Sequence, residues 1–205
     1  GGLLAGLGKR PEAADWFREG ALEEDGIFNA IMASYLERHD GRFYMPEKIF
    51  ADPRDYEHFT TVPAIVSMRE KFLGFASSSL PRFAAPLTVL DVGCGDGSLL
   101  VLLLQRLIKA GRAQKINRAI LVDSSAPMLE VAEGKLRKAF PDLTVVPRHG
   151  RIQEHAGELP AGIDVALLSL AYHHMPWDDK ATHLREMSGK VEHLLLMEMD
   201  GDNDT

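Results

Sequence analysis

Three closely spaced glycines follow a short apolar run near the middle of the chain. Residues 87–92 read Leu-Thr-Val-Leu-Asp-Val, and five residues of alternating type come next: Gly93, Cys94, Gly95, Asp96 and Gly97. A second apolar run, residues 98–108, follows at once. This order predicts a strand, a tight glycine turn and a helix. Such a turn lets a ligand approach the backbone closely and points the first amides of the helix at it.

The spacing of the glycines discriminates between ligands. A dinucleotide fingerprint, Gly-x-Gly-x-x-Gly, would need a glycine at position 98, where the chain has Ser98. A nicotinamide oxidoreductase is therefore disfavoured. The string Asp-x-Gly-x-Gly-x-Gly, which starts at Asp91, resembles motif I of the class I S-adenosylmethionine (SAM) dependent methyltransferases. In that family the glycine turn holds the amino-acid half of SAM.

A second carboxylate follows the next predicted strand. Residues 118–122 are largely apolar and end in Asp123, which lies 28 residues after Gly95. A carboxylate at this place can accept two hydrogen bonds from a ribose diol. Ser125 is then expected to cap a helix that has Pro127 in its first turn and ends near Phe140.

The resemblance implies a larger set of cofactor contacts. Many relatives place an acid after the third strand to accept from the adenine amino group, but this chain has Arg151 there. Ile152 can still pack on the adenine, and the carbonyl of Gln153 can accept from the amino group. The complete set of residues expected to contact SAM is Asp91, Gly93, Cys94, Gly95, Gly97, Asp123, Ser124, Met128, Ile152 and Ser169.

The fourth predicted strand, residues 163–170, leads into Ala-Tyr-His-His-Met-Pro. Ligands of open α/β sheets lie beyond the carboxyl ends of the strands, so this segment is expected in the site. It resembles the Ser-x-x-x-His-His-Leu-Pro stretch of many small-molecule methyltransferases. We therefore take His173, His174 and Glu198 as catalytic candidates, since a neutral imidazole can accept a proton from a nucleophile. Alternatively, the histidines only order the loop.

A metal site is the other possibility at these strand ends. The residues concerned are His173, His174, Glu198, Asp200 and Asp202. Two imidazoles and a carboxylate would suit divalent iron. No spacing among them is diagnostic, so the sequence analysis assigns no metal ligand.

Five predicted strands alternate with helical segments. Their ranges are 87–92, 118–123, 143–147, 163–170 and 191–199. The pattern predicts a doubly wound, mostly parallel α/β sheet in an αβα sandwich. The family resembled has two further strands, which this sequence lacks after the fifth. The apolar edge at residues 194–196 is then expected to be covered by a missing C-terminal part or by another chain.

Residues 1–86 are expected to form a separate helical lid, and residues 87–205 the SAM-binding core. Residues 13–38 and 62–73 have helical patterns, the second broken by the serines at 77–79 and by Pro81. Tyr44, Tyr56 and Phe59 are candidates for a substrate wall, or alternatively anchors of a small core. The Gly-Gly start suggests a tag remnant, a trimmed chain or an excised piece of a longer protein.

Composition limits the partners. The 205 residues are 45% apolar and carry a net charge of −7, which argues against a nucleic-acid partner. A single cysteine excludes a disulfide framework and a cysteine zinc cluster. Neither a signal peptide nor a membrane span is evident, which favours a cytoplasmic protein without membrane contact. The resemblance implies a small-molecule or carrier-bound methyl acceptor; the alternative is a SAM-binding module without activity.

Overall fold

The computed structural model describes residues 4–5, 7–22, 29, 32–33, 36–37, 53–172, 175 and 177–198. The chain divides into two compact units, Gly1–Arg69 and Glu70–Thr205. The division falls within helix α6 (Pro63–Ser79), so the last turns of this helix belong to the same unit as the sheet. Each unit is described separately below.

The second unit is built on one parallel sheet. Its strands are β1 (Leu87–Val92), β2 (Ile116–Asp123), β3 (Thr144–His149), β4 (Ile163–Ser169) and β5 (Val191–Met197). Their order is β3-β2-β1-β4-β5, and every pairing is parallel. The predicted doubly wound sheet is therefore confirmed, with strand bounds close to the expected ones. Because the order reverses between β1 and β4, a crevice for ligands is expected at their carboxyl ends.

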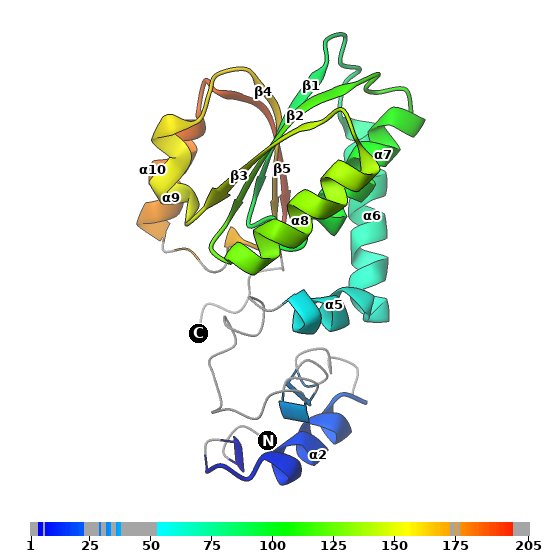
Figure 1. The fold of residues 1–205 in the computed structure, drawn as a ribbon, viewed down its shortest axis with the longest axis vertical. Helices are drawn as coiled ribbons and strands as arrows, with labels where there is room; N and C mark the ends of the chain where they lie inside the picture. Colours follow the sequence, from blue (N-terminus) through cyan, green and yellow to red (C-terminus); the bar gives the residue numbers. More distant parts are fainter. Residues whose placement is uncertain are drawn as a thin grey trace. The chain divides into compact units, whose positions relative to one another are not determined.

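Helices lie on both faces of this sheet (Figure 1). Helices α7 (Ser98–Lys109) and α8 (Ala126–Ala139) cover one face. The short helix α9 (Ile152–His155), the 3₁₀ turn η1 (Ala156–Glu158) and α10 (Trp177–Met187) lie on the other. The expected cap of α8 is present, because the Ser125 hydroxyl accepts from the Met128 amide at 3.3 Å.

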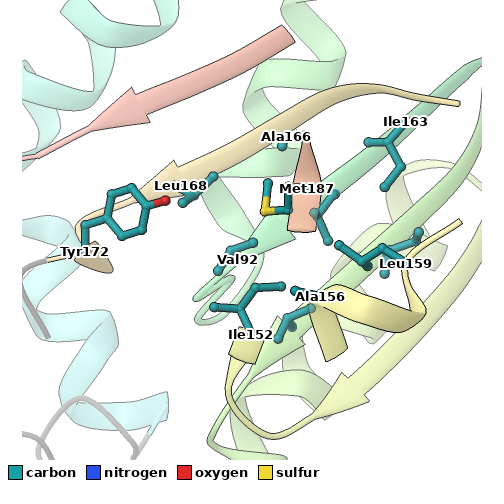
Figure 2. Close-up of a cluster of buried hydrophobic side chains, with 12 residues drawn as sticks. Val92, Ile152, Ala156, Leu159, Ile163, Ala166, Leu168, Tyr172 and Met187 are labelled. Atoms are coloured by element: carbon teal, nitrogen blue, oxygen red, sulfur yellow. The ribbon is translucent and has the colours of Figure 1, made fainter. Parts of the chain in front are cut away.

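The face under α9 and α10 holds a buried apolar cluster, part of which is drawn in Figure 2. Alternate strand residues such as Leu90, Val92 and Leu168 point into it, as the period of two along a strand requires. On β5 the same face carries Leu194 and Leu196, which stay 44% and 49% exposed. The described residues thus leave this edge apolar and uncovered, as expected from the sequence, although Leu195 between them is buried.

The N-terminal unit differs from its predicted helices. Helix α2 (Arg10–Gly20) covers the first part of the predicted range 13–38 and ends where the Leu22 amide donates to the Glu19 carbonyl, three residues back. Residues 29, 32–33 and 36–37 are also helical, so the later part of this range agrees wherever the structure describes it. An unpredicted helix, α5 (Pro53–Thr61), carries Tyr56 and Phe59.

Helix α6 also runs further than predicted. Its last three residues are the serines that were expected to break it. The Ser77 and Ser78 hydroxyls donate to the carbonyls of Gly74 and Phe75 at 3.1 and 2.9 Å, so both polar side chains are satisfied within the helix. The helix stops before Pro81 instead. In the part of the chain that the structure describes, no helix is both long and apolar enough to cross a membrane.

One glycine of the turn is required by packing inside the protein. Gly97 has a φ of +72°, and a Cβ at this position would lie 2.9 Å from both Cα and Cβ of Ala132 on α8. Such a separation is too short for two carbons, so α8 would have to move. Gly97 therefore sets how closely α8 can approach the start of α7.

We expect Gly97→Ala to destabilise the protein more than Gly111→Ala. Gly111 has a similar φ of +65° but nothing within 4 Å of its Cβ position, so it is a matched control for backbone strain, about 1–2 kcal/mol. The clash with Ala132 should add about 1–3 kcal/mol at Gly97. Urea denaturation of both variants measures the difference, and equal losses would show that α8 does not constrain Gly97.

Candidate functional site

The glycine turn joins β1 to α7 and lies against the end of β2. Gly93, Gly95 and Gly97 all have positive φ, at 66°, 52° and 72°. Residues with a side chain rarely adopt a positive φ, which explains why each of these positions is a glycine. The amides of Gly93 and Cys94 both donate to the carbonyl of Val122, at 2.8 and 3.2 Å. The predicted motif is thus a turn that β2 holds in place.

Asp123, at the end of β2, is bound to the same turn. Its Oδ2 accepts from the Gly95 amide at 2.8 Å, and its Oδ1 accepts from the Ser125 amide at 2.8 Å. Burial raises the pKa of Asp123, while the two amides and nearby His149 oppose the rise. A carboxylate has about four acceptor positions. Each Asp123 oxygen therefore keeps the capacity to accept once more, as a ribose diol requires.

The environment of Cys94 keeps its thiol protonated. Its side chain is buried, and burial together with the carboxylates of Asp91, Asp123 and Asp96 raises the pKa of the thiol well above its ordinary value. A thiol that stays protonated is a poor nucleophile. Cys94 serves as a small residue that fits the turn.

The tip of β4 also meets the glycine turn. A Cβ at Gly93 would lie 2.7 Å from Cβ of Ala171, two residues beyond β4. Between them in sequence, Leu170 adopts a φ of 53°, which a side chain tolerates only with strain. Its amide donates to the Met197 carbonyl of β5 at 2.7 Å. The chain is thus bent sharply where β4 ends, and Gly93 leaves room for Ala171.

Tyr172 connects this bend to two neighbouring elements. Its amide donates to Oε1 of Glu198, just after β5, at 2.5 Å. Its hydroxyl lies 2.7 Å from Nε2 of His183, a fully buried residue of α10, whose Nδ1 lies 3.1 Å from the Asp179 carbonyl. Because that carbonyl can only accept, Nδ1 carries the proton and Nε2 accepts from Tyr172. Burial raises the pKa of Tyr172 to about 12.

Three predicted site residues, Glu198, Met128 and Ile152, are bound to or enclosed by other parts of the protein. The Glu198 carboxylate already orders the β4 tip through the Tyr172 amide. Met128 and Ile152 are 1% and 2% exposed, and Figure 2 shows Ile152 beside Ala156 in the buried cluster. Both side chains are enclosed by protein, and contact of either with SAM stays a prediction. Five further predicted residues lie outside the described ranges: Tyr44, His173, His174, Asp200 and Asp202.

The carboxyl end of β3 lies on the same side of the sheet as the carboxyl ends of β1 and β2. Nε2 of His149 lies 3.1 Å from the carbonyl of Ser124, which ties β3 to the residue after Asp123. The Gln153 amide group donates to Asp179 of α10 at 3.1 Å, while its carbonyl oxygen is buried without a partner among the described residues. Gln153 thus retains the acceptor that the sequence analysis assigned to it.

The predicted aromatic wall lies within the N-terminal unit. Arg69 donates to the Tyr56 hydroxyl at 3.1 Å, and the Tyr56 and Phe59 rings are 5.8 Å apart. Phe59 is 9% exposed. These contacts are those of a small core, so a role in substrate binding stays a prediction. Over the described ranges no group of three or more metal-ligating side chains occurs, and His173 and His174 lie outside that search.

Some residues around the site had no sequence signal. His183, Asp179 and Ala171 acquire their roles only when α10 and the β4 tip come together. Lys135, ten residues into α8, contacts the glycine turn through Asp96 and Ser98. In sequence it is one of several lysines and arginines on an amphipathic helix, which is why the pattern did not single it out.

Comparisons with known proteins agree with the motif. Residues 89–192, a little over half of the chain, match the model of a methyltransferase domain family. The search of curated proteins finds no match. Solved structures with a similar fold include the YcgJ protein of Bacillus subtilis, 22% identical, covering 60% of this chain and 47% of that one, with a TM-score of 0.44.

Two further structures are similar. One is described as a putative SAM-dependent methyltransferase from Methanococcus maripaludis, 18% identical, covering 74% of this chain and 64% of that one, with a TM-score of 0.48. The other is geranyl diphosphate methyltransferase with GPP and sinefungin, 19% identical, covering 60% and 40%, with a TM-score of 0.46. The present chain spans less than two thirds of the length of each of these structures.

The family match identifies the class of protein. The chain belongs to the methyltransferase domain family, and the class I assignment predicted from Asp91 to Gly97 is confirmed.

We expect His183 to make stability depend on pH. Burial lowers the pKa of His183 from its ordinary 6.5, against the opposing effects of Asp179 and Glu186. As the pH falls, the imidazole is therefore protonated at a higher pH in the unfolded chain than in the folded one. The contribution of neutral His183 to the free energy of unfolding is complete above pH 6.5, and it is lost as the pH falls through the lower folded-state pKa. Between pH 7 and 5, His183→Gln should lose less unfolding free energy than the wild type. Parallel urea titrations at each pH measure this, and identical slopes would contradict it.

Proposed function

We propose that this chain binds SAM and transfers its methyl group to a small-molecule or carrier-tethered acceptor. The observation that carries the proposal is the meeting of the glycine turn with Asp123 at the carboxyl ends of β1 and β2. The family match supports methyl transfer in general. The choice of cofactor rests on the Asp-x-Gly-x-Gly-x-Gly string and on this geometry.

The residues present fit the chemistry of SAM. Each oxygen of Asp123 accepts one amide and can accept a ribose hydroxyl as well. The turn presents backbone rather than side chains, which suits the amino-acid half of the cofactor. The carboxylates of Asp91 and Asp123 lie near Cys94 and contribute negative charge that favours a positively charged ligand, whereas the charge of Asp96 is balanced by Lys135. For the adenine amino group, the buried Gln153 carbonyl is the acceptor we favour.

When bound, SAM supplies a methyl group on a sulfonium that an acceptor atom can displace in line. The protein's part is then to orient the acceptor and to remove a proton where the acceptor is neutral. We assign the acceptor to the space beyond β4 and β5, next to Ala171 and Glu198, because ligands of such sheets lie beyond the carboxyl ends of the strands. His173 and His174 follow directly in sequence and are the candidates for proton removal.

Asp123→Ala should weaken SAM binding. Loss of a hydrogen-bonded charged group costs about 1.5–3 kcal/mol, which corresponds to roughly a 10- to 150-fold weaker Kd. Isothermal titration of the wild type and the variant with SAM measures the change, at a temperature where circular dichroism shows both folded. NAD serves as the control ligand and should not bind. Tighter binding of NAD than of SAM would contradict the cofactor assignment.

His173→Ala and His174→Ala should separate binding from transfer. Neither residue is assigned to the cofactor, so SAM affinity should stay within a few-fold of the wild type. At least one variant should lose methyl transfer by about 10²-fold, the usual size of a general-base effect. The readout is S-adenosylhomocysteine release against a panel of small hydroxyl, amine, thiol and activated-carbon acceptors. Wild-type rates of methyl transfer in both variants would show that neither histidine is catalytic and that both only order the loop.

A SAM-binding module without transfer activity is the second candidate. The observation that favours it is the use of Glu198 to hold the Tyr172 amide, which ties up one of the three catalytic candidates. Single-turnover reactions with labelled SAM across the same acceptor panel distinguish the two. Binding without any labelled product would favour the module.

A further inference from the structure

Asp96 is the charged residue inside the glycine turn, and it is 5% exposed. Its Oδ1 accepts from the Ser98 amide at 3.1 Å, at the first turn of α7, and its Oδ2 accepts from the Ser98 hydroxyl at 2.7 Å. A buried carboxylate is unfavourable unless its charge is balanced. Two hydrogen bonds from one serine do not supply a positive charge.

Lys135 supplies that charge from another helix. Its Nζ lies 2.5 Å from Oδ2 of Asp96 and 2.7 Å from the Ser98 hydroxyl. The side chain of Lys135 is 43% exposed, whereas that of Asp96 is 7% exposed. The pair therefore differs from an ordinary surface ion pair, because one partner has little access to water. Burial would raise the pKa of Asp96, but the bonds from Lys135 and Ser98 outweigh it and lower the pKa.

The position of Lys135 on α8 allows this helix to hold the glycine turn at two points. Lys135 lies three residues after Ala132, so both side chains are on the same face of α8. Ala132 occupies the space beside Gly97, while Lys135 holds Asp96 and Ser98 on either side of that glycine. Residues 96–98 are thus fixed to α8 by one close packing contact and one charged contact.

A turn with three glycines needs such a constraint. Glycine reaches many backbone conformations that other residues cannot, so an unconstrained turn would spend part of its time in shapes that do not bind ligand. The affinity measured for a ligand falls in proportion to the fraction of molecules in the competent shape. A contact that removes the other shapes raises affinity without touching the ligand.

We propose that Lys135 is a positioning residue for the cofactor: it holds the Asp96–Ser98 part of the glycine turn in the binding-competent shape from α8. The inference rests on the proposed function, since the turn is taken to bind SAM. The Nζ of Lys135 is engaged by Asp96 and by Ser98 of the turn. Its removal should therefore weaken binding of every ligand that uses the turn, whatever the charge on the ligand.

The test is isothermal titration of Lys135→Met with SAM and with S-adenosylhomocysteine, at a temperature where the variant is fully folded. Through-protein coupling of this kind changes affinity by roughly 3- to 30-fold. Lys138→Met is the matched control, because Lys138 is exposed on the same helix. It should bind both ligands as the wild type does. Lys135→Arg should restore most of the affinity.

The pair of ligands separates positioning from simple electrostatics. SAM carries a sulfonium charge that S-adenosylhomocysteine lacks, so removal of a nearby cation alone would tighten SAM relative to S-adenosylhomocysteine. Equal weakening of both ligands supports positioning, and tighter SAM binding overturns it.

Asp96→Asn gives a second check through a double-mutant cycle. If Lys135 acts through Asp96, the double variant should bind SAM no more weakly than Asp96→Asn alone. Lower thermal stability of Lys135→Met with unchanged affinity would show a purely structural role and overturn the inference. A wild type that binds neither ligand would instead overturn the proposed function.

Discussion

The site depends on the two hydrogen bonds that the carboxylate of Asp123 accepts. This carboxylate takes an amide of the glycine turn on one oxygen and the amide of Ser125 on the other, so a single side chain joins the loops that follow β1 and β2. Parallel pairing of β1 with β2 brings these loops to the same edge, and the Asp123 contacts then fix their relative position. The arrangement is maintained at an energetic cost, since burial disfavours the charged form of this carboxylate. Such a cost is typical of groups retained for binding.

The two faces of the sheet have different tasks. On the side of α7 and α8, close packing at Gly97 and the charge of Lys135 hold the turn rigid. On the side of α9 and α10, the Tyr172–His183 bond and the Gln153–Asp179 bond fasten α10 to the end of β4 and to α9. The first set lies beside the turn proposed to hold the amino-acid half of the cofactor. In the second set, Gln153 is the residue proposed for the adenine amino group, and the Tyr172–His183 bond lies at the end of β4, where the methyl acceptor is proposed to bind.

Sequence patterns predicted the sheet well because the central strands β1, β2 and β4 are largely buried apolar runs bounded by turn residues. The motif from Asp91 to Gly97 and the cap at Ser125 could also be predicted, because a positive φ at glycine and a helix N-cap depend on neighbouring residues in the sequence. The N-terminal helices were predicted less well, since Ser77 and Ser78 can satisfy their hydroxyls within a helix as readily as outside it. The roles of Ala132, Lys135 and His183 depend on contacts between distant segments, which no local pattern encodes.

The contact between Gly93 and Ala171 limits how the segment after β4 can be redesigned. A Cβ at Gly93 would lie only 2.7 Å from Cβ of Ala171, so no side chain fits at Gly93 unless Ala171 moves, and the small Ala171 is part of this close contact. A loop transplanted from another enzyme onto this scaffold would therefore have to keep a small residue at position 171 and begin its new sequence at Tyr172 or later. Recombination junctions placed before Leu170, where φ is 53°, would also have to reproduce that bend. The practical boundary between a reusable scaffold and an exchangeable loop thus lies after residue 171.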